Sequence, residues 1–204
     1  MTDFISSELH QDLTSALLVL KQGGVVAFPT ETYYGLAVDP FNSQAVERLF
    51  LLKQRPSAKP ILVLIDRQER LSDLCAEIPG QFQPLLDRFW PGPLTLIFPA
   101  LPDLSPPLTA GTGTVGVRIS SHPLALAFCA LAGGAITATS ANLSGLRPAA
   151  SEHEVLVQFG THLDWLVKGG ATQGGLASTI VAADRGGLRL VREGVIPFGE
   201  IRNG

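Results

Sequence analysis

The hexapeptide PILVLI, residues 60–65, is the stretch from which the fold of this chain is best read. It is short, partly β-branched and free of charge, and it follows a loop that contains Pro56. A run of this kind predicts a strand that is buried on both faces, because a half-exposed strand alternates apolar and polar residues. Such a strand lies inside a sheet that helices cover, so the flanking sequence is expected to supply both.

Strands and helices are predicted on both sides of this segment. The other strand candidates are 25–28, 34–38, 94–98, 114–119, 135–139, 165–169, 178–184 and 188–193. Helical spacing predicts helices over 9–20, 43–55, 68–77, 81–89, 123–132 and 152–159. Ser43 is the expected cap of the second helix, and His122 is expected to start the fifth. Because the order lacks a clean strand–helix alternation, we expect an α/β fold: one large, twisted, open mixed sheet with helices packed on it.

The composition indicates a folded chain and excludes several classes. Hydrophobic residues make up 46% of the 204 residues and charged residues 16%, which argues against disorder. The formal net charge of −3 excludes a histone-like composition, although it allows a local basic cleft. No linker-like run divides the chain, so residues 1–204 are expected to form a single domain. Cys75 and Cys129 lack ligand spacing and are expected as buried thiols in a reducing, cytoplasmic compartment.

The common catalytic signatures are missing from this sequence. There is no phosphate-binding G-x-x-x-x-G-K-[ST], no G-x-G-x-x-G, no H-E-x-x-H and no G-x-S-x-G. The four histidines are scattered and none has a nucleophile pattern beside it. Nucleophilic catalysis and a metal site built from protein ligands are therefore disfavoured.

Polar residues nevertheless gather where the predicted strands end. Residues 29–35, PTETYYG, place hydroxyls, a carboxylate and two aromatics in one turn, and residues 137–145, TATSANLSG, leave a strand with hydroxyl and amide groups. Ser178 and Thr179 open a later strand, and Arg192 lies on the last one. Two explanations remain open for each group. It could simply form a local structure such as a β-turn or a capped turn, or it could belong to an anion-binding site.

Positive charge is concentrated between residues 48 and 70. This stretch contains six basic and two acidic residues, so its net charge is +4, whereas the whole chain has a net charge of −3. Lys53, Arg55 and Lys59 lie together in KQRPSAKP, whose prolines stiffen it. We expect a loop that suits a triphosphate, in which truncation of Lys53 or Arg55 leaves the fold intact; the alternative is a solvated basic loop after a helix.

Arg118 interrupts the apolar strand TVGVRI at residues 114–119. A buried arginine needs a partner, since an unpaired charge in an apolar interior is costly. The sequence leaves two explanations open: a structural ion pair with an acid elsewhere in the chain, or an arginine that faces a cleft and binds a carboxylate ligand.

Seven segments, in order, resemble the YrdC-type threonylcarbamoyl-AMP synthases. They are PTETYYGL, KQRPSAKPILVLI, WPGPLTLIF, TVGVRISSHP, ITATSANLSG, STIV and VREGVIP, and the resemblance runs from about residue 24 to residue 201. It implies a twisted α/β sheet around a deep basic cleft, and an enzyme that makes threonylcarbamoyl-adenylate and pyrophosphate from L-threonine, bicarbonate or CO2, and ATP with Mg²⁺. A separate complex would then pass the threonylcarbamoyl group to tRNA. The chain ends just after VREGVIPFGEI and so is expected to be the short, single-domain form.

The resemblance also implies roles for individual residues. Lys53 and Arg55 would be catalytic, and the threonine site would comprise Thr32, Arg118 and Ser178, with Arg118 on the carboxylate. The ATP site would comprise Lys53, Arg55, Lys59, Thr114, Ser140, Asn142 and Arg192. No protein nucleophile and no protein metal ligand are implied, and no role is assigned to Glu31 or Tyr34.

Two positions depart from the family pattern. Some members carry a histidine at the position of Leu64, which helps to hold threonine, and many read R-P-G where this chain has Arg192-Glu193-Gly194. Two other functions remain alternatives: an RNA-binding module, which the net charge of −3 disfavours, and a paralogue of the same fold with a different acceptor.

Overall fold

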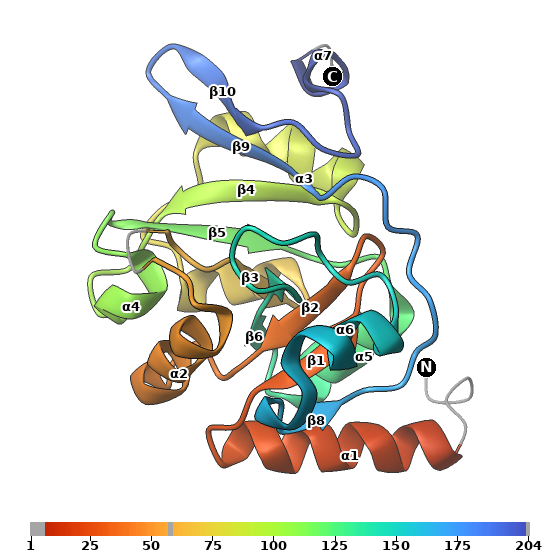
Figure 1. The fold of residues 1–204 in the computed structure, drawn as a ribbon. Helices are drawn as coiled ribbons and strands as arrows, with labels where there is room; N and C mark the ends of the chain where they lie inside the picture. Colours follow the sequence, from red (N-terminus) through yellow and green to blue (C-terminus); the bar gives the residue numbers. More distant parts are fainter. Residues whose placement is uncertain (1–6, 57–58, 203–204) are drawn as a thin grey trace.

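The computed structural model describes residues 7–56 and 59–202, and it confirms the mixed α/β architecture (Figure 1). The strands form two sheets. The smaller has the order β7-β2-β1-β8 and the larger the order β10-β9-β4-β5-β3-β6, and each combines parallel and antiparallel pairs. The strands are β1 (Val26–Pro29), β2 (Tyr34–Ala37), β3 (Val63–Ile65), β4 (Leu94–Pro99), β5 (Thr114–Arg118), β6 (Ala135–Thr137), β7 (Thr139–Ser140), β8 (Trp165–Leu166), β9 (Thr179–Asp184) and β10 (Gly187–Arg192).

The expectation of a single large sheet was wrong, and the segment 135–140 shows why. Its first part, β6, pairs with β3 in the larger sheet, whereas β7 pairs with β2 in the smaller one. At the crossing, Thr137 N–H donates to the Val38 carbonyl, while its Oγ1 accepts from Val38 N–H at 2.9 Å. An apolar pattern reports that a strand is buried, but it does not report which strands flank it.

The helices cover the sheets and divide the apolar interior into two clusters. They are α1 (Ser7–Lys21), α2 (Ser43–Lys53), α3 (Gln83–Phe89), α4 (Pro106–Thr109), α5 (Pro123–Leu131), α6 (Glu152–Phe159) and α7 (Phe198–Arg202), with short 3₁₀ segments at Gln68–Asp73, Gly80–Phe82 and Gly160–His162. α1 and α5 contribute to one cluster with Phe28, Leu64 and Ile136, whereas α2 and α3 contribute to the other. Figure 1 shows α1 running beside β8 at one end of the molecule, with β9, β10 and α7 at the opposite end.

The helix boundaries agree with the sequence patterns in outline and differ in detail. Asn42, not Ser43, caps α2: its side chain accepts from Ala45 N–H at 3.1 Å. The helix expected over 68–77 is only a 3₁₀ segment at Gln68–Asp73, and the one expected over 81–89 is divided between Gly80–Phe82 and α3. His122 precedes α5 with Pro123 in the first turn, as predicted.

The apolar run after His122 is interior to the domain. It forms α5, a nine-residue helix whose inward residues are buried, and then β6. Within the described part of the chain, every helix is too short or too polar to cross a bilayer.

Candidate functional site

The candidate site is a cleft of about 370 Å³ at the junction of the two sheets. β2 and β7 of the smaller sheet line it on one side, and β4, β5, β9 and β10 of the larger sheet line it on the other. β6 and β7 carry the chain from the larger sheet to the smaller one. This crossing, which the single-sheet prediction missed, also creates the cleft.

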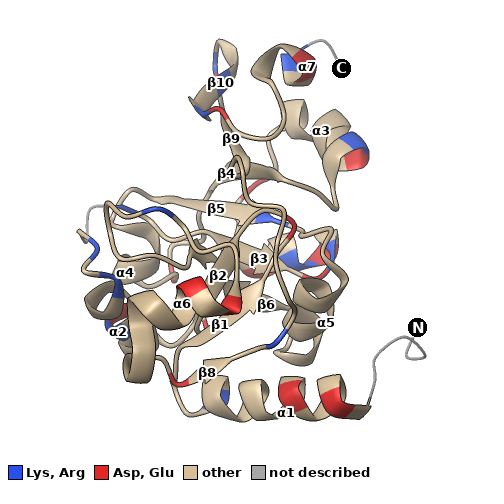
Figure 2. Cartoon of the chain, turned by 45° about the vertical axis from the view of Figure 1, so that its right-hand side comes forward, with Lys and Arg blue, Asp and Glu red and all other residues tan. Residues whose placement is uncertain are grey.

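Four basic side chains line the cleft: Arg55, Lys59, Arg118 and Arg192. Figure 2 shows basic segments of the ribbon beside α2 and α4. Burial lowers the pKa of Arg55, and it lowers the pKa of Arg192 together with the repulsion of Arg118 and then Arg55. Charges of one sign from three separate segments therefore face a shared space, which a polyanion would relieve.

Arg55 is held in place by its own loop. Its Nε donates to the Lys59 carbonyl at 3.1 Å, and its Nη2 donates to the Pro60 carbonyl at 2.9 Å. Neither bond neutralises the guanidinium, because both acceptors are uncharged. The side chain keeps its full positive charge at the edge of the cleft.

The PTETYYG segment forms the tight connection of the β1–β2 hairpin. Thr30 N–H and Oγ1 both donate to the Tyr33 carbonyl, at 3.2 and 2.7 Å, and the Thr30 and Thr32 hydroxyls lie 3.1 Å apart. Farther along, the Tyr33 hydroxyl donates to the Gly175 carbonyl and the Tyr34 hydroxyl to the Gly170 carbonyl. Thr30 bonds its own backbone segment, as the explanation by local structure predicted, although residues 31–33 form a bend rather than a hydrogen-bonded β-turn; Thr32 also lines the cleft.

Arg118 forms an ion pair with an acid elsewhere in the chain, which was the first of the two explanations that the sequence left open. Its Nη1 donates to Glu31 Oε1 at 2.5 Å, and the arginine side chain is only 7% exposed. Ser120 Oγ donates to the other oxygen of the same carboxylate. Burial lowers the pKa of Arg118, and Glu31 opposes that shift. Arg118 nevertheless lines the cleft, so the ion pair does not remove it from the site.

Ser178 and Arg192 are joined directly. Arg192 Nη2 donates to the Ser178 carbonyl at 2.8 Å and to Ser178 Oγ at 3.2 Å. The Ser178 hydroxyl also lies 3.0 Å from the hydroxyl of Thr95, which is fully buried on β4. The sequence analysis overlooked Thr95, although a hydroxyl in the apolar run LTLIF was the available signal.

Lys53 is not the loop residue that the sequence predicted. It ends α2 with 1% exposure, and its Nζ donates to the carbonyls of Ser140 and Asn142, the latter at 2.7 Å. Burial, and secondarily Arg55, lowers the pKa of Lys53 to about 7. The premise that Lys53 lies on a loop is therefore wrong, and its truncation is now expected to destabilise the fold, because the Asn142 carbonyl has no other described donor.

Two more predicted site residues lie outside the cleft lining. The Thr114 hydroxyl is 2.8 Å from that of Thr112 at the start of β5. The Asn142 amide donates to the Leu143 and Leu146 carbonyls and its Oδ1 accepts from Ser140 Oγ, so it shapes the turn that presents Ser140. The predicted residues that do line the cleft are Thr32, Arg55, Lys59, Arg118, Ser140, Ser178 and Arg192.

The two departures from the family pattern also have defined surroundings. Leu64 is 1% exposed and packs in the cluster of α1 and α5, where its strand neighbour in β5 is Arg118. Glu193 Oε1 accepts from Phe198 N–H at 3.0 Å, so this carboxylate caps the start of α7.

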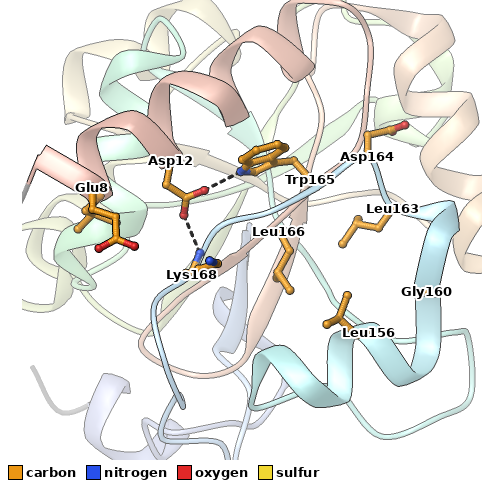
Figure 3. A pocket seen from close by; sticks show the side chains of 10 residues that line it. Glu8, Asp12, Leu156, Gly160, Leu163, Asp164, Trp165, Leu166 and Lys168 are labelled. Atoms are coloured by element: carbon orange, nitrogen blue, oxygen red, sulfur yellow. Dashed lines mark hydrogen bonds between the residues drawn. The ribbon is translucent and has the colours of Figure 1, made fainter.

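A larger cavity, about 680 Å³, lies among α1, α6 and β8 and shares no lining residue with the cleft (Figure 3). Asp12 accepts there from Trp165 Nε1 and from Lys168 N–H, each at 2.8 Å. Asp12 thus ties α1 to the chain after β8, and the charged residues of this lining, Glu8, Asp12, Asp164 and Lys168, are of mixed sign. The cleft at the sheet junction remains the better candidate because all of its charged lining residues are basic.

A protein-built metal site is not found in the described part of the chain. No three His, Cys, Asp or Glu side chains gather closely enough there to hold a metal ion. Glu31, the acid paired with Arg118, has both oxygens engaged, one by Arg118 and the other by Ser120. The residues present therefore do not fit a resident Mg²⁺.

Comparison with known proteins gives consistent matches over most of the chain. The Sua5/YciO/YrdC family model, described as "Telomere recombination", matches residues 18–194. A threonylcarbamoyl-AMP synthase of Bacillus subtilis is 43% identical over 89% of this chain and 53% of its own length, and one of Pyrococcus abyssi is 38% identical over 89% and 54%. The chain thus spans about half the length of these two relatives. A homologue from Halorhodospira halophila with the same name is 42% identical over 74% of this chain and 78% of its own length.

Comparison with solved structures points to the same family. P. abyssi Sua5 complexed with L-threonine superposes with a TM-score of 0.90 at 37% identity, covering 94% of this chain and 56% of that one. Escherichia coli YciO superposes with a TM-score of 0.84 at 22% identity over 97% and 95%, which speaks for the fold alone. The chain belongs to the Sua5/YciO/YrdC family.

Proposed function

We propose that this chain is a threonylcarbamoyl-AMP synthase, which converts L-threonine, bicarbonate or CO2, and ATP into threonylcarbamoyl-adenylate and pyrophosphate. The observation that carries the proposal is the cleft, in which Arg55, Arg118 and Arg192 converge from three segments beside the hydroxyls of Thr32 and Ser178. The relatives named for this activity support it, as does the L-threonine bound to P. abyssi Sua5.

The chemistry suits a site without a protein nucleophile. The threonine amine attacks bicarbonate with loss of water, or CO2 with loss of a proton, to give a carbamate. A carbamate oxygen then attacks the α-phosphate of ATP and releases pyrophosphate. The protein has to hold two anionic substrates in contact and stabilise the charge that develops on the phosphate. Arg118 would bind the threonine carboxylate, with Thr32 and Ser178 as hydrogen-bond partners. Arg55, Lys59, Arg192 and Ser140 would hold the nucleotide.

Three residues that were expected to contact ATP directly have a different role in this proposal. Lys53 and Asn142 act on the turn that carries Ser140 rather than on the nucleotide itself. Thr114 would reach ATP only at the rim of the site, because it does not line the cleft. Mg²⁺ enters as the counter-ion of ATP, whose phosphates and waters supply the oxygen ligands that it prefers.

One incubation tests the activity. Purified protein receives MgATP and bicarbonate with threonine, with serine or with no amino acid, and pyrophosphate and the adenylate are quantified. We expect pyrophosphate release that requires both threonine and bicarbonate. Equal release without any amino acid would contradict the proposal, and a preference for serine would favour a paralogue with another acceptor.

The wider setting remains a prediction. The adenylate would pass to a tRNA-modifying complex, and the reaction would take place in the cytoplasm. Binding of RNA by this chain alone has a simple test: affinity measured over a range of salt concentrations. A log–log slope steeper than the few phosphate contacts available to one basic loop would favour the RNA-binding alternative.

A further inference from the structure

Glu31 lies at the tip of the β1–β2 connection and, although it is an acid, it pairs with Arg118, an arginine that lines the cleft. Its side chain is 11% exposed, and both of its carboxylate oxygens have partners: Arg118 Nη1 on one and Ser120 Oγ on the other. Ser120 is itself fixed, because its Oγ accepts from His122 N–H at 3.2 Å. The carboxylate is therefore held by two residues, the last one of β5 and Ser120, which follows that strand.

The contacts of Arg118 divide its guanidinium into two edges. Nη1 carries the bond to Glu31, and no described residue bonds to Nε or Nη2. Those two nitrogens also do not belong to the fully buried polar atoms that lack a partner, which are found in Asp66, Arg70, Ser105 and His122. Nε and Nη2 therefore keep access to solvent, and the space that Arg118 lines is the cleft.

We infer that Glu31 is a positioning residue: it holds Arg118 in the one orientation that presents the free edge of the guanidinium to the threonine carboxylate. The inference rests on the proposed function. An arginine has many rotamers and loses side-chain entropy when it is fixed, so an internal partner that fixes it beforehand improves the affinity for the ligand.

Charge makes the same arrangement selective. Arg55, Arg118 and Arg192 repel one another across the cleft, and Glu31 offsets part of that repulsion at the position of Arg118 alone. Arg118 is thus kept in place without a bound anion, whereas Arg55 and Arg192 keep their full charge for the nucleotide. Loss of Glu31 should affect threonine binding far more than ATP binding.

The test measures KM and kcat for both substrates in four proteins: wild type, Glu31→Ala, Glu31→Gln and Ser120→Ala. Glu31→Ala should raise the KM for threonine at least tenfold, with the KM for ATP changed less than twofold and kcat changed less than the threonine KM. Glu31→Gln keeps an acceptor for Arg118 Nη1 and should recover most of the threonine affinity. Ser120→Ala removes one of the two clamps without uncovering a charge, so a twofold to fivefold effect on the same KM is expected.

Arg48→Gln is the matched control, because it breaks an ion pair of 2.8 Å between Arg48 and Asp164 outside the cleft. It should leave both KM values unchanged. Should Glu31→Ala not fold, Glu31→Gln and Ser120→Ala still carry the test. Variants that lose thermal stability but keep the wild-type KM for threonine would overturn the inference, as would tighter threonine binding by Glu31→Ala, which would make Glu31 a competitor of the substrate.

The same measurements distinguish failure of this inference from failure of the proposed function. If wild type forms no adenylate and binds no threonine by calorimetry, the proposed function falls. If wild type is active and the Glu31 variants match it in threonine KM, only the positioning role falls.

Discussion

Lys53 shows how one buried charge can organise a turn. Its ammonium group reaches the carbonyls of Ser140 and Asn142, 87 and 89 residues away in sequence, and no carboxylate neutralises it among its described hydrogen-bond partners. A cation bonded to carbonyl dipoles is less costly than an unsatisfied one. Removing it leaves the Asn142 carbonyl without a described donor, whereas the Ser140 carbonyl still accepts from Asn142 N–H at 3.0 Å.

We predict that Lys53→Met, which keeps the approximate volume, lowers the free energy of unfolding by about 1–3 kcal/mol, the cost of leaving the Asn142 carbonyl without a donor. Chemical denaturation measures this loss. The exposed neighbour Gln54 offers the control, because Gln54→Ala at this left-handed position alters neither carbonyl. A stability equal to that of wild type would show that Lys53 lies in solvent.

The same residue predicts a pH dependence. Burial lowers its pKa from 10.5 to about 7 in the folded chain, so between those values the unfolded chain holds a proton that the folded chain has lost. Unfolding therefore binds a proton, and the free energy of unfolding rises with pH in this window, by at most about 1.4 kcal/mol per pH unit. The difference in unfolding free energy between wild type and Lys53→Met should grow from pH 7 to pH 9. A constant difference would contradict the lowered pKa.

Arg118→Lys separates the two edges of the arginine. A lysine can still pair with Glu31 as a point charge, but it cannot offer a second donor edge to a carboxylate. We expect a threonine dissociation constant at least tenfold weaker, an ATP dissociation constant within about twofold, and a modest fall in melting temperature. Calorimetric titration with each substrate measures both constants. Normal threonine affinity with a large loss of melting temperature would leave Arg118 as a purely structural residue.

At the scale of elements, β9 and the chain after β10 are packed too closely to admit a side chain at Gly194. A Cβ on Gly194 would come within 2.1 Å of the Ala177 carbonyl oxygen and 2.6 Å of the Ser178 carbonyl carbon. Both contacts are with backbone, so neither can rotate away. The position of Ser178, and through it the hydrogen bonds of Arg192, depends on this glycine.

Gly194→Ala should therefore destabilise the fold by about 1–3 kcal/mol and weaken threonine binding as Ser178 shifts. The matched control is Gly199→Ala in α7, where a Cβ would meet nothing within 4 Å. Thermal unfolding and calorimetry on both variants provide the check. If Gly194→Ala behaved like the control, the close packing at Ser178 would be refuted.

At the scale of the whole molecule, the two sheets are connected through Thr137. This residue ends β6 and is fully buried. Its hydroxyl accepts from Val38 N–H, directly after β2 of the smaller sheet, at 2.9 Å, and it donates to the Leu36 carbonyl in β2 at 3.3 Å. The separation of the sheets, and hence the width of the cleft, depends on that contact.

Thr137→Val keeps the shape and removes the hydroxyl, so we expect a loss of about 1–3 kcal/mol from the unsatisfied buried amide. Thr14→Val on the exposed side of α1 also removes a hydroxyl, there bonded to the His10 carbonyl, and should stay within about 0.5 kcal/mol of wild type. Denaturation curves of the two variants test the contrast. Equal stabilities would mean that the hydroxyl does not link the sheets.

The sequence by itself determined the local features of this protein. Strands such as LTLIF, TVGVR and STIVAAD were predicted close to their observed bounds, because burial on a sheet imposes an apolar pattern that can be read along the chain. The segments that line the cleft were also found, since hydroxyls and arginines at strand ends contrast with the apolar runs beside them.

Only the tertiary structure decided which of these segments meet. β6 and β7 read as one strand until their partners, β3 and β2, place them in different sheets. Lys53 reads as a loop cation until the turn at 140–142 covers it, and Arg118 pairs with an acid 87 residues away. The physical reason is the same in each case: strand pairing, burial of a charge and the choice of an ion-pair partner depend on distances in space, which no pattern along the chain records.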